Sequence, residues 1–207
     1  MEVLVIDHPL VADRLTNIRS ASTPNTSFRH HLHEISIFLI YEALRDLELV
    51  EIDVDTPLAS TSSFILKEHP VFVPILRAGL GMLDAALLLS PEADVAFVGA
   101  KRDEATLQPD IYLNTIPESL DGSKVVILDP ALATGGSMIQ AMELAKTSGA
   151  GEITVVTVLS SPEGIEALRK SGLGEKVVTA AIDQRLNDTG FIYPGLGDAG
   201  DRQYGID

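Results

Sequence analysis

The stretch that decides the fold of this chain is Val125-Val-Ile-Leu-Asp129-Pro-Ala-Leu-Ala-Thr134-Gly-Gly-Ser137. Its first four residues are apolar and mostly β-branched, which predicts a short buried strand. An acid ends this strand, and a turn of small residues leads into a segment with the apolar spacing of a helix. The stretch therefore reads as strand, loop and helix.

The loop of this stretch has the composition of a phosphate-binding loop. Gly135 and Gly136 allow backbone N–H groups to approach a phosphate closely, and the hydroxyls of Thr134 and Ser137 add donors. The helix N-terminus contributes a favourable dipole. Asp129 would repel a phosphate, but its carboxylate is a strong acceptor for sugar hydroxyls. Together these groups predict a site for a ribose phosphate.

The rest of the chain repeats the same alternation. Apolar runs at 71–76, 95–98, 125–128, 153–159 and 177–182 alternate with helix-like segments at 80–89, 136–148 and 163–171. Strands without polar alternation, separated by helices, are typical of a parallel sheet buried on both faces. We expect an α/β fold with an open, mostly parallel sheet and flanking helices.

The segments outside this alternation give further expectations. A strand at 2–6 and helices at 9–19 and 25–45 are predicted, and the second helix is apolar all round at 37–40, so it is either deeply buried or, as we favour, at a subunit interface. Residues 50–54 alternate like a strand, and 60–63 read as a polar turn. The long segment 101–123 is a candidate lid, and the glycine-rich tail from 187 is a candidate ordered arm without helical period.

Three segments are expected to meet at one edge of the sheet. Ligands of open parallel sheets bind beyond the carboxyl ends of the strands. Arg77 follows the run at 71–76, Lys101 and Arg102 follow the next run, and the loop that begins at Asp129 follows the third. Spacing alone also allows Arg77 to be a helix-capping or surface arginine, and Arg102 belongs to a mixed-charge patch that is typical of a solvated surface.

Four stretches resemble the type I phosphoribosyltransferase family. The Asp129–Ser137 loop is similar to the loop that binds phosphoribosyl pyrophosphate (PRPP), with a single acid in place of the two adjacent acids of many members. That departure is shared by the uracil phosphoribosyltransferase branch. Three further stretches point to the same branch, namely Pro74-Ile-Leu-Arg-Ala-Gly-Leu-Gly-Met82, Lys101-Arg-Asp-Glu-Ala-Thr-Leu107 and Gly195-Leu-Gly-Asp-Ala-Gly-Asp201.

The resemblance implies an enzyme that converts PRPP and uracil to UMP and diphosphate with Mg²⁺, in pyrimidine salvage. It implies catalytic roles for Asp129, Arg102 and Asp198. The PRPP site would comprise Arg77, Arg102, Asp129, Pro130, Ala131, Leu132, Ala133, Thr134, Gly135, Gly136, Ser137 and Asp198. The uracil pocket would comprise Ile192, Gly197, Asp198 and Ala199. No residue is expected to bind Mg²⁺ directly; the ion would be held through PRPP and water near Asp198.

We expect a single domain over 1–207, with a core at about 70–183 and a small hood from 1–69 and 184–207.

Composition excludes several other classes of protein. The 207 residues carry 30 acids against 15 bases, and a formal charge of −15 would repel nucleic acid and anionic membranes. No apolar run approaches the ~18–20 residues of a membrane helix. The absence of cysteine fits a cytoplasmic protein. His30, His31 and His33 are interpreted as part of a polar helix face and not as metal ligands, because no further ligand accompanies them.

Several alternatives stay open from the sequence. The enzyme could use another nucleobase with PRPP, or the chain could be a non-catalytic regulator that senses PRPP or a nucleotide, even through RNA, although its acidity argues against RNA. Some members of the branch are activated by GTP, so GTP is considered as an effector. A homodimer or higher homo-oligomer is expected. Arg185 is either a surface change or an additional anion contact.

Overall fold

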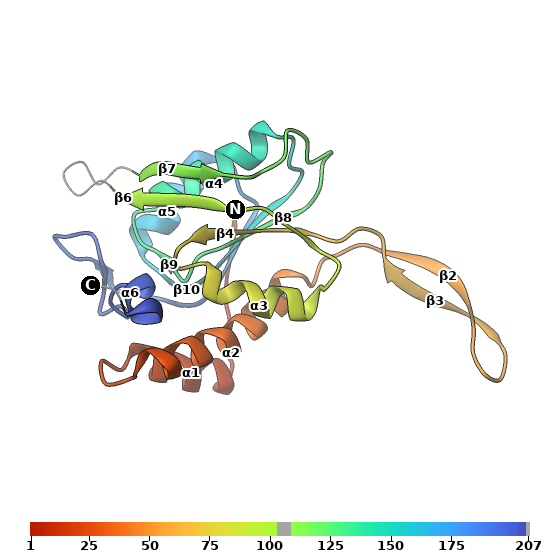
Figure 1. Cartoon of the computed structure of the whole chain (residues 1–207), viewed down its shortest axis with the longest axis horizontal. Coiled ribbons are helices and arrows are strands. Elements are labelled where there is room, and N and C mark those ends of the chain that lie inside the picture. The colour runs from red at the N-terminus through yellow and green to blue at the C-terminus, as the bar shows by residue number, and fades with distance from the viewer. Residues whose placement is uncertain (103–108, 206–207) are drawn as a thin grey trace.

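The computed structural model describes residues 1–102 and 109–205, and its centre is a mostly parallel sheet with strand order β1-β11-β10-β8-β4-β6-β7 (Figure 1). Strand β7 is antiparallel to β6, and the short strands β5 and β9 pair with β4 and β10. The strands are β1 (Glu2–Val5), β4 (Val71–Leu76), β5 (Asp94–Val95), β6 (Val98–Arg102), β7 (Pro109–Asn114), β8 (Val125–Leu128), β9 (Ala131–Leu132), β10 (Ile153–Ser160) and β11 (Lys176–Ile182).

Helices cover both faces of this sheet, which confirms the predicted α/β fold with a mostly parallel sheet (Figure 1). Side chains of β8 alternate between the two layers. Val126 and Leu128 pack in the cluster that includes the residues of α1 to α3, whereas Val125 and Ile127 pack with those of α4 and α5. The helices are α1 (Pro9–Arg19), α2 (Asn25–Ala43), α3 (Leu80–Leu89), α4 (Gly136–Thr147), α5 (Pro162–Ser171) and α6 (Ala199–Tyr204).

Four segments differ from the sequence-based expectations. The predicted run at 95–98 is divided between β5 and β6, and the predicted loop at 101–123 contains β7. Residues 60–63 were predicted as a turn but begin strand β3 (Ser60–Leu66), because they pair with β2 (Leu49–Asp55) in a hairpin outside the apolar core. The tail holds the short helix α6, which follows the small hairpin of β12 (Arg185–Leu186) and β13 (Ile192–Tyr193).

The apolar helix α2 is part of the chain's own core. Leu39 and Ile40 are fully buried, and Ile37 and Phe38 are partly buried against the same cluster. Its neighbours are the helices α1, α3 and α6 and the strands β10 and β11. The second of the two sequence interpretations, a subunit interface made by these residues, is therefore not needed to explain the all-round apolar pattern.

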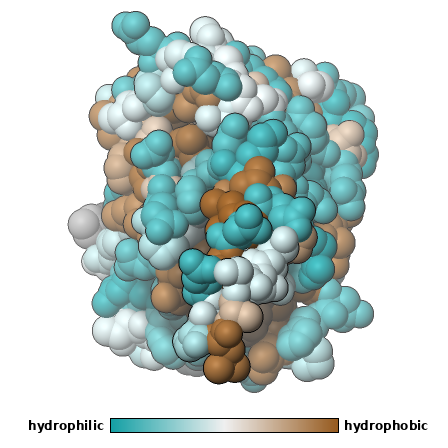
Figure 2. All heavy atoms as spheres, turned by 90° about the vertical axis from the view of Figure 1, so that its right-hand side faces the viewer, coloured by the Kyte–Doolittle hydropathy of each residue, from teal (hydrophilic) through white to brown (hydrophobic). Residues whose placement is uncertain are grey.

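The β2–β3 hairpin projects from the body as a long arm (Figure 1). Large apolar side chains on it are exposed, with 96% of Leu58 and 62% of Phe64 accessible, together with much of Leu49 and Ile65. Figure 2 faces the end of the molecule that carries this arm and shows hydrophobic residues surrounded by hydrophilic ones. In the part of the chain that the structure describes, no helix is both long and apolar enough to span a membrane.

Candidate active site

The loop after β8 is held by backbone contacts that aim Asp129 at the carboxyl edge of the sheet. The Asp129 carboxylate accepts the N–H of Ala131 at 3.1 Å, a local turn that an Asp side chain forms readily. The carbonyl of Pro130 accepts the N–H groups of Val158 and Leu159, both at 3.0 Å, so the loop is tied to β10. These bonds fix the direction of the carboxylate relative to the sheet.

The loop enters α4 through a glycine that has the left-handed conformation. Gly135 has φ +84° and is the N-cap of α4, a conformation that most other residues adopt only with strain. The N–H of Ile139 donates to the carbonyl of Gly135 at 2.8 Å, whereas the N–H groups of the first turn have no partner within the helix. The N-terminus of α4 can therefore supply backbone donors to an anion.

A cavity of about 450 Å³ lies at this edge, between the ends of β4, β6 and β8. From the central strand β4, the chain continues to β6 on one side and later to β8 on the other side. The strand order therefore reverses at β4, and the cavity lies at the topological switch point of the sheet. The structure brings Arg77, Lys101 and Asp129 together here, as the sequence predicted, and Ser137 and Asp198 also line the cavity. The side chain of Arg102 lies outside the described residues, and so does part of the predicted lid, 103–108.

The guanidinium of Arg77 is held by the C-terminal helix. Its Nη2 donates to Asp201 Oδ1 at 2.9 Å, and about half of the Arg77 side chain is exposed toward the cavity and solvent. An exposed ion pair of this kind contributes little to stability and exchanges its partner at low cost. Arg77 is thus available to an anionic ligand that enters the cavity.

A second cavity of about 230 Å³ adjoins the first. Both cavities have Ala78, Asp129, Asp198 and Gly200 in their walls. The smaller one is also lined by all four residues of the predicted uracil pocket and by Ala131 and Ala133 of the β8–α4 loop; the four pocket residues are Ile192, Gly197, Asp198 and Ala199. The predicted PRPP and uracil sites are therefore neighbours in space.

The carboxyl of Asp129 is in an environment that favours its protonated form. Burial raises the pKa of Asp129 to about 7, and the carboxylate of Asp198 acts in the same direction, while the N–H of Ala131 opposes them. Asp198 itself caps α6, because its carboxylate accepts the N–H of Asp201 at 2.9 Å. Two carboxylates in one cavity repel each other, and a bound cation or hydroxyl donors would stabilise their ionised forms.

Some of the predicted residues have side chains that do not face either cavity. The side chain of Leu132 is buried in the core, and Pro130 is buried as well. Within the described part of the chain, five predicted residues are absent from the walls of both cavities, namely Pro130, Leu132, Thr134, Gly135 and Gly136. Sequence reasoning missed Tyr112, which lines the larger cavity, because it lies on β7, in a segment where no strand was predicted.

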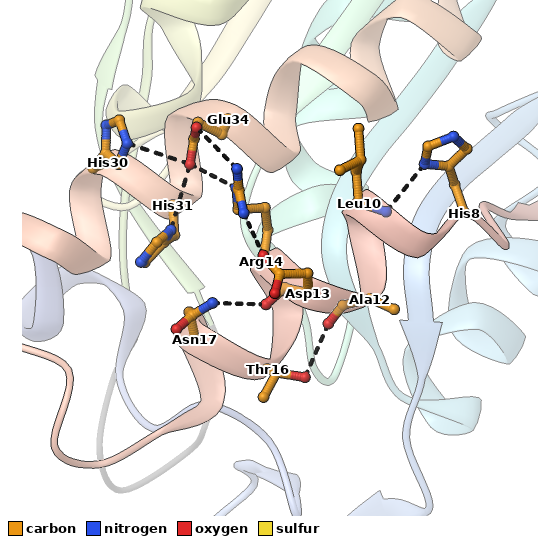
Figure 3. A network of polar contacts seen from close by, with 10 residues as sticks. All are labelled: His8, Leu10, Ala12, Asp13, Arg14, Thr16, Asn17, His30, His31 and Glu34. Atoms are coloured by element: carbon orange, nitrogen blue, oxygen red, sulfur yellow. Dashed lines mark hydrogen bonds and ion pairs between the residues drawn. The ribbon is translucent and has the colours of Figure 1, made fainter.

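Two of the three histidines of α2, His30 and His31, lie in a separate network with α1 (Figure 3). The carboxylate of Glu34 is 2.7 Å from Nε of Arg14, and it also faces His30 and His31, each at 3.4 Å. Arg14 therefore neutralises the acid that these histidines face. In the described residues no group of three or more His, Asp or Glu side chains is placed to hold a metal ion.

Arg185, the residue with two open interpretations, packs on the surface of the tail. Its guanidinium lies 4.9 Å from the centre of the Tyr193 ring and donates to the carbonyl of Leu186 at 3.1 Å. Among the described residues it is not part of the wall of either cavity. Its contacts are those of a side chain that covers the β12–β13 hairpin.

Solved structures resemble this chain over most of its length. The AQ2163 protein of Aquifex aeolicus has a TM-score of 0.94 and 39% identity, and the match covers 99% of both chains. An adenine phosphoribosyltransferase from Thermoanaerobacter pseudethanolicus has a TM-score of 0.52 and 16% identity, covering 77% of this chain and 85% of that one. The second likeness supports the fold alone.

Relatives matched by sequence have a higher identity to this chain than these two solved structures. A uracil phosphoribosyltransferase of Corynebacterium diphtheriae is 50% identical over 205 residues, which are 99% of this chain and 97% of the relative. One of Corynebacterium urealyticum is 48% identical over 206 residues, or 99% and 96% of the two chains. The model of the family described as uracil phosphoribosyltransferase matches residues 5–206. With this match and these relatives, the chain belongs to the uracil phosphoribosyltransferase family.

Proposed function

We propose that this chain transfers the phosphoribosyl group of PRPP to uracil, giving UMP and diphosphate, as a step of pyrimidine salvage. The observation that carries the proposal is the pair of adjoining cavities that share Asp129 and Asp198. The larger one is lined by the cations Arg77 and Lys101 and by Ser137 of the first turn of α4, which suits phosphates, and the smaller one has the size and backbone character for a base. A sugar bound over the shared wall would have its anomeric carbon facing the base.

Different residues around the larger cavity are proposed to bind different groups of PRPP. The 5-phosphate is proposed to bind the Thr134–Ser137 loop at the start of α4, where backbone donors are available. Asp129 accepts hydrogen bonds from the ribose hydroxyls, and Arg77, with Arg102 as the sequence predicts, binds the diphosphate. The bond from C1′ to the diphosphate oxygen breaks and the bond to uracil N1 forms, while the N1 proton of uracil passes to water and the diphosphate leaves with the bonding electron pair. Arginine donors stabilise the charge that grows on the diphosphate.

The acidic residues of the shared wall fit a Mg²⁺ ion bound with PRPP. Asp129 and Asp198 lie close enough for the second to raise the pKa of the first, and carboxylate oxygens are ligands that Mg²⁺ prefers. We propose that Asp198 faces the ion through water and that diphosphate oxygens hold it. When bound, Mg²⁺ would neutralise charge on the leaving group. Arg77 and the α4 N-terminus would orient the same substrate.

Backbone groups of the tail are proposed to select uracil. Uracil presents two carbonyl acceptors and a ring N–H donor, which main-chain groups near Gly197 and Ala199 can satisfy. Cytosine carries an amino group where uracil has a carbonyl, so a donor of the pocket would be left unpaired. Ile192, 9% exposed, supplies an apolar wall for the ring.

The test is diphosphate release on mixing the protein with PRPP and Mg²⁺ and each of uracil, cytosine, hypoxanthine and orotate. Release with uracil alone supports the proposal. Release with another base, and not with uracil, would favour the other-nucleobase alternative. Binding of PRPP without turnover of any base would favour a regulator.

We also propose a homo-oligomer in which the β2–β3 hairpin packs against a second copy of this chain. An isolated two-stranded hairpin is marginally stable in water, and this one exposes Leu49, Leu58, Phe64 and Ile65. Three further expectations stay predictions from the sequence. They are the division into a core at about 70–183 and a hood, activation by GTP, and a cytoplasmic location.

A further inference from the structure

Helix α1 is connected to the predicted uracil pocket by an ion pair that touches neither cavity. Arg19, in the last turn of α1, donates from Nη1 to Asp183 Oδ2 at 2.8 Å and from Nη2 to Asp183 Oδ1 at 2.5 Å. Asp183 follows β11, and its side chain is 6% exposed. A two-pronged pair in this degree of burial is oriented much more strictly than a surface pair.

The side chains of Arg19 and Asp183 also bind the backbone of Gly195 in the tail, one at its carbonyl and the other at its N–H. Asp183 Oδ2 accepts the N–H of Gly195 at 2.9 Å, and Arg19 Nη1 donates to the carbonyl of Gly195, also at 2.9 Å. Gly195 has φ +67°, and a Cβ built there would lie 2.1 Å from the carbonyl oxygen of Ile192. Gly195 is therefore held at a tight turn, and its neighbours along the chain, Ile192, Leu196 and Gly197, line the smaller cavity.

A second arginine ties the tail to the same end of α1. Arg202 Nη1 donates to the carbonyl of Leu196 at 2.8 Å, and its guanidinium also donates to the carbonyls of Ile18 and Ser20.

The carboxyl of Asp183 stays ionised although it is buried. Desolvation favours its neutral form, but Arg19 and the Gly195 N–H hold the pKa of Asp183 below its ordinary value. The pair is thus charged at neutral pH.

We propose that Arg19 and Asp183 are positioning residues for base recognition, which hold residues 192–199 through Gly195 in the conformation that receives uracil. This inference rests on the proposed function, because it assigns the smaller cavity to the base. Neither side chain is among the described residues that line the cavities, so both act through the backbone.

The test compares Asp183→Asn and Arg19→Lys with the wild type in steady-state kinetics. Asn keeps the shape of Asp183 but loses one acceptor, and Lys keeps the charge of Arg19 but loses the fork. We expect KM for uracil to rise about tenfold or more in each variant, with KM for PRPP within about twofold of the wild type. In the double variant the two effects should not add, because both act on Gly195.

A matched control is available on the protein surface. Arg45 makes a similar two-pronged pair with Glu42 at 2.7 and 2.8 Å, near the end of α2. Arg45→Ala should leave both KM values unchanged. Equal rises of both KM values in Asp183→Asn, or an unchanged KM for uracil in folded variants, would overturn the proposal.

Hydrogen exchange separates this inference from the proposed function. In the ligand-free protein, peptides that cover residues 190–199 should exchange faster in Asp183→Asn than in the wild type, while peptides from β4 and β8 should not change. This holds whichever base the wild type uses. Unchanged exchange in 190–199 would refute the positioning role, whereas absence of uracil turnover in the wild type would refute the proposed function alone.

Discussion

At the scale of single residues, the site depends on a carboxyl group that the fold keeps partly out of water. Asp129 has a pKa of about 7, raised first by burial and then by Asp198. A group in this state is costly to ionise in the empty site, and ribose hydroxyls or a cation would offset that cost. Binding of PRPP is therefore expected to be linked to deprotonation of Asp129.

Replacement of Asp129 by Asn should cut kcat/KM for PRPP by roughly 10- to 100-fold, since a hydrogen bond to a charged group contributes about 1.5–3 kcal/mol. Asn keeps the shape and the acceptor for Ala131 N–H, so the fold should be retained. Steady-state kinetics at saturating uracil measure the effect. Wild-type kinetics in this variant would remove Asp129 from its assigned role.

The raised pKa also predicts a pH dependence of stability. Asp129 is protonated in the folded protein up to about pH 7 but ionises at its ordinary pKa of 3.8 in the unfolded chain. Its contribution to the free energy of unfolding is thus full below that ordinary value and is lost as the pH rises to about 7. Thermal unfolding without ligand should show a steeper decline of Tm over this window in the wild type than in Asp129→Asn. Parallel curves would contradict the shift.

Asp198 is expected to have two separable roles. Its carboxylate caps α6 through the N–H of Asp201, and it lines both cavities. Asp198→Asn retains a capping oxygen, whereas Asp198→Ala loses it at a cost of about 0.5–2 kcal/mol. Both variants should impair uracil use, but only Ala should lower the midpoint of urea unfolding. A normal rate with uracil in either variant would count against the pocket.

At the scale of elements, α5 supports the β8–α4 loop, which is proposed to bind PRPP. Ser161 caps α5 by accepting the N–H of Gly164 at 2.8 Å, and its hydroxyl donates to the carbonyl of Ala133 at 2.6 Å. Ala133 belongs to the β8–α4 loop and lines the smaller cavity. One hydroxyl thus joins the start of α5 to the β8–α4 loop.

Ser161→Ala is expected to destabilise the protein by about 1–2 kcal/mol, from loss of the cap and of the bond to Ala133, and to raise KM for PRPP because the β8–α4 loop loses that bond. Urea unfolding measures this change. Ser171→Ala, which removes a hydroxyl bond to Leu168 at the other end of α5, is a control that should leave KM for PRPP unaltered. If Ser161→Ala raised KM for PRPP no more than the control, the loop would be independent of α5.

The projecting hairpin gives a prediction about assembly. Phe64 lies opposite Glu51, so Phe64→Lys replaces an exposed apolar side chain by one that can pair across the strands. Sedimentation should show a smaller species for this variant than for the wild type. Leu88→Lys, at a similarly exposed position on α3, should sediment like the wild type. An unchanged mass in Phe64→Lys would exclude the hairpin as the contact.

At the scale of the whole molecule, the fold was predictable wherever buried apolar runs decide structure. Strands β4 and β8 and helices α1 and α3 have the predicted bounds because their residues pack on the sheet. Strand β3 was missed because its serines have no apolar signal and depend on pairing with β2. Helix α6 was missed because its glycine and aspartate are poor helix formers; the Asp198 cap and tertiary contacts of Arg202 hold it.

The candidate site was predictable to the extent that topology and the family resemblance determine it. Strand ends placed Arg77 and Asp129 at one crevice, as the cavity confirms. Pairings between distant residues could not be derived, since nothing in the sequence relates Arg77 to Asp201 or Arg19 to Asp183. The roles assigned to the site residues stay predictions until the variants are measured.

The two cavities with a common wall also bear on inhibitor design. On the proposed assignment of the cavities, a molecule that joins a pyrimidine dione to a charged sugar mimic would occupy both at once, and its second half would bind at a high effective concentration. Because Ala78, Asp129, Asp198 and Gly200 belong to both walls, the connecting atoms would have to be few. Compact bisubstrate compounds are therefore better suited to this protein than two fragments connected by a long tether.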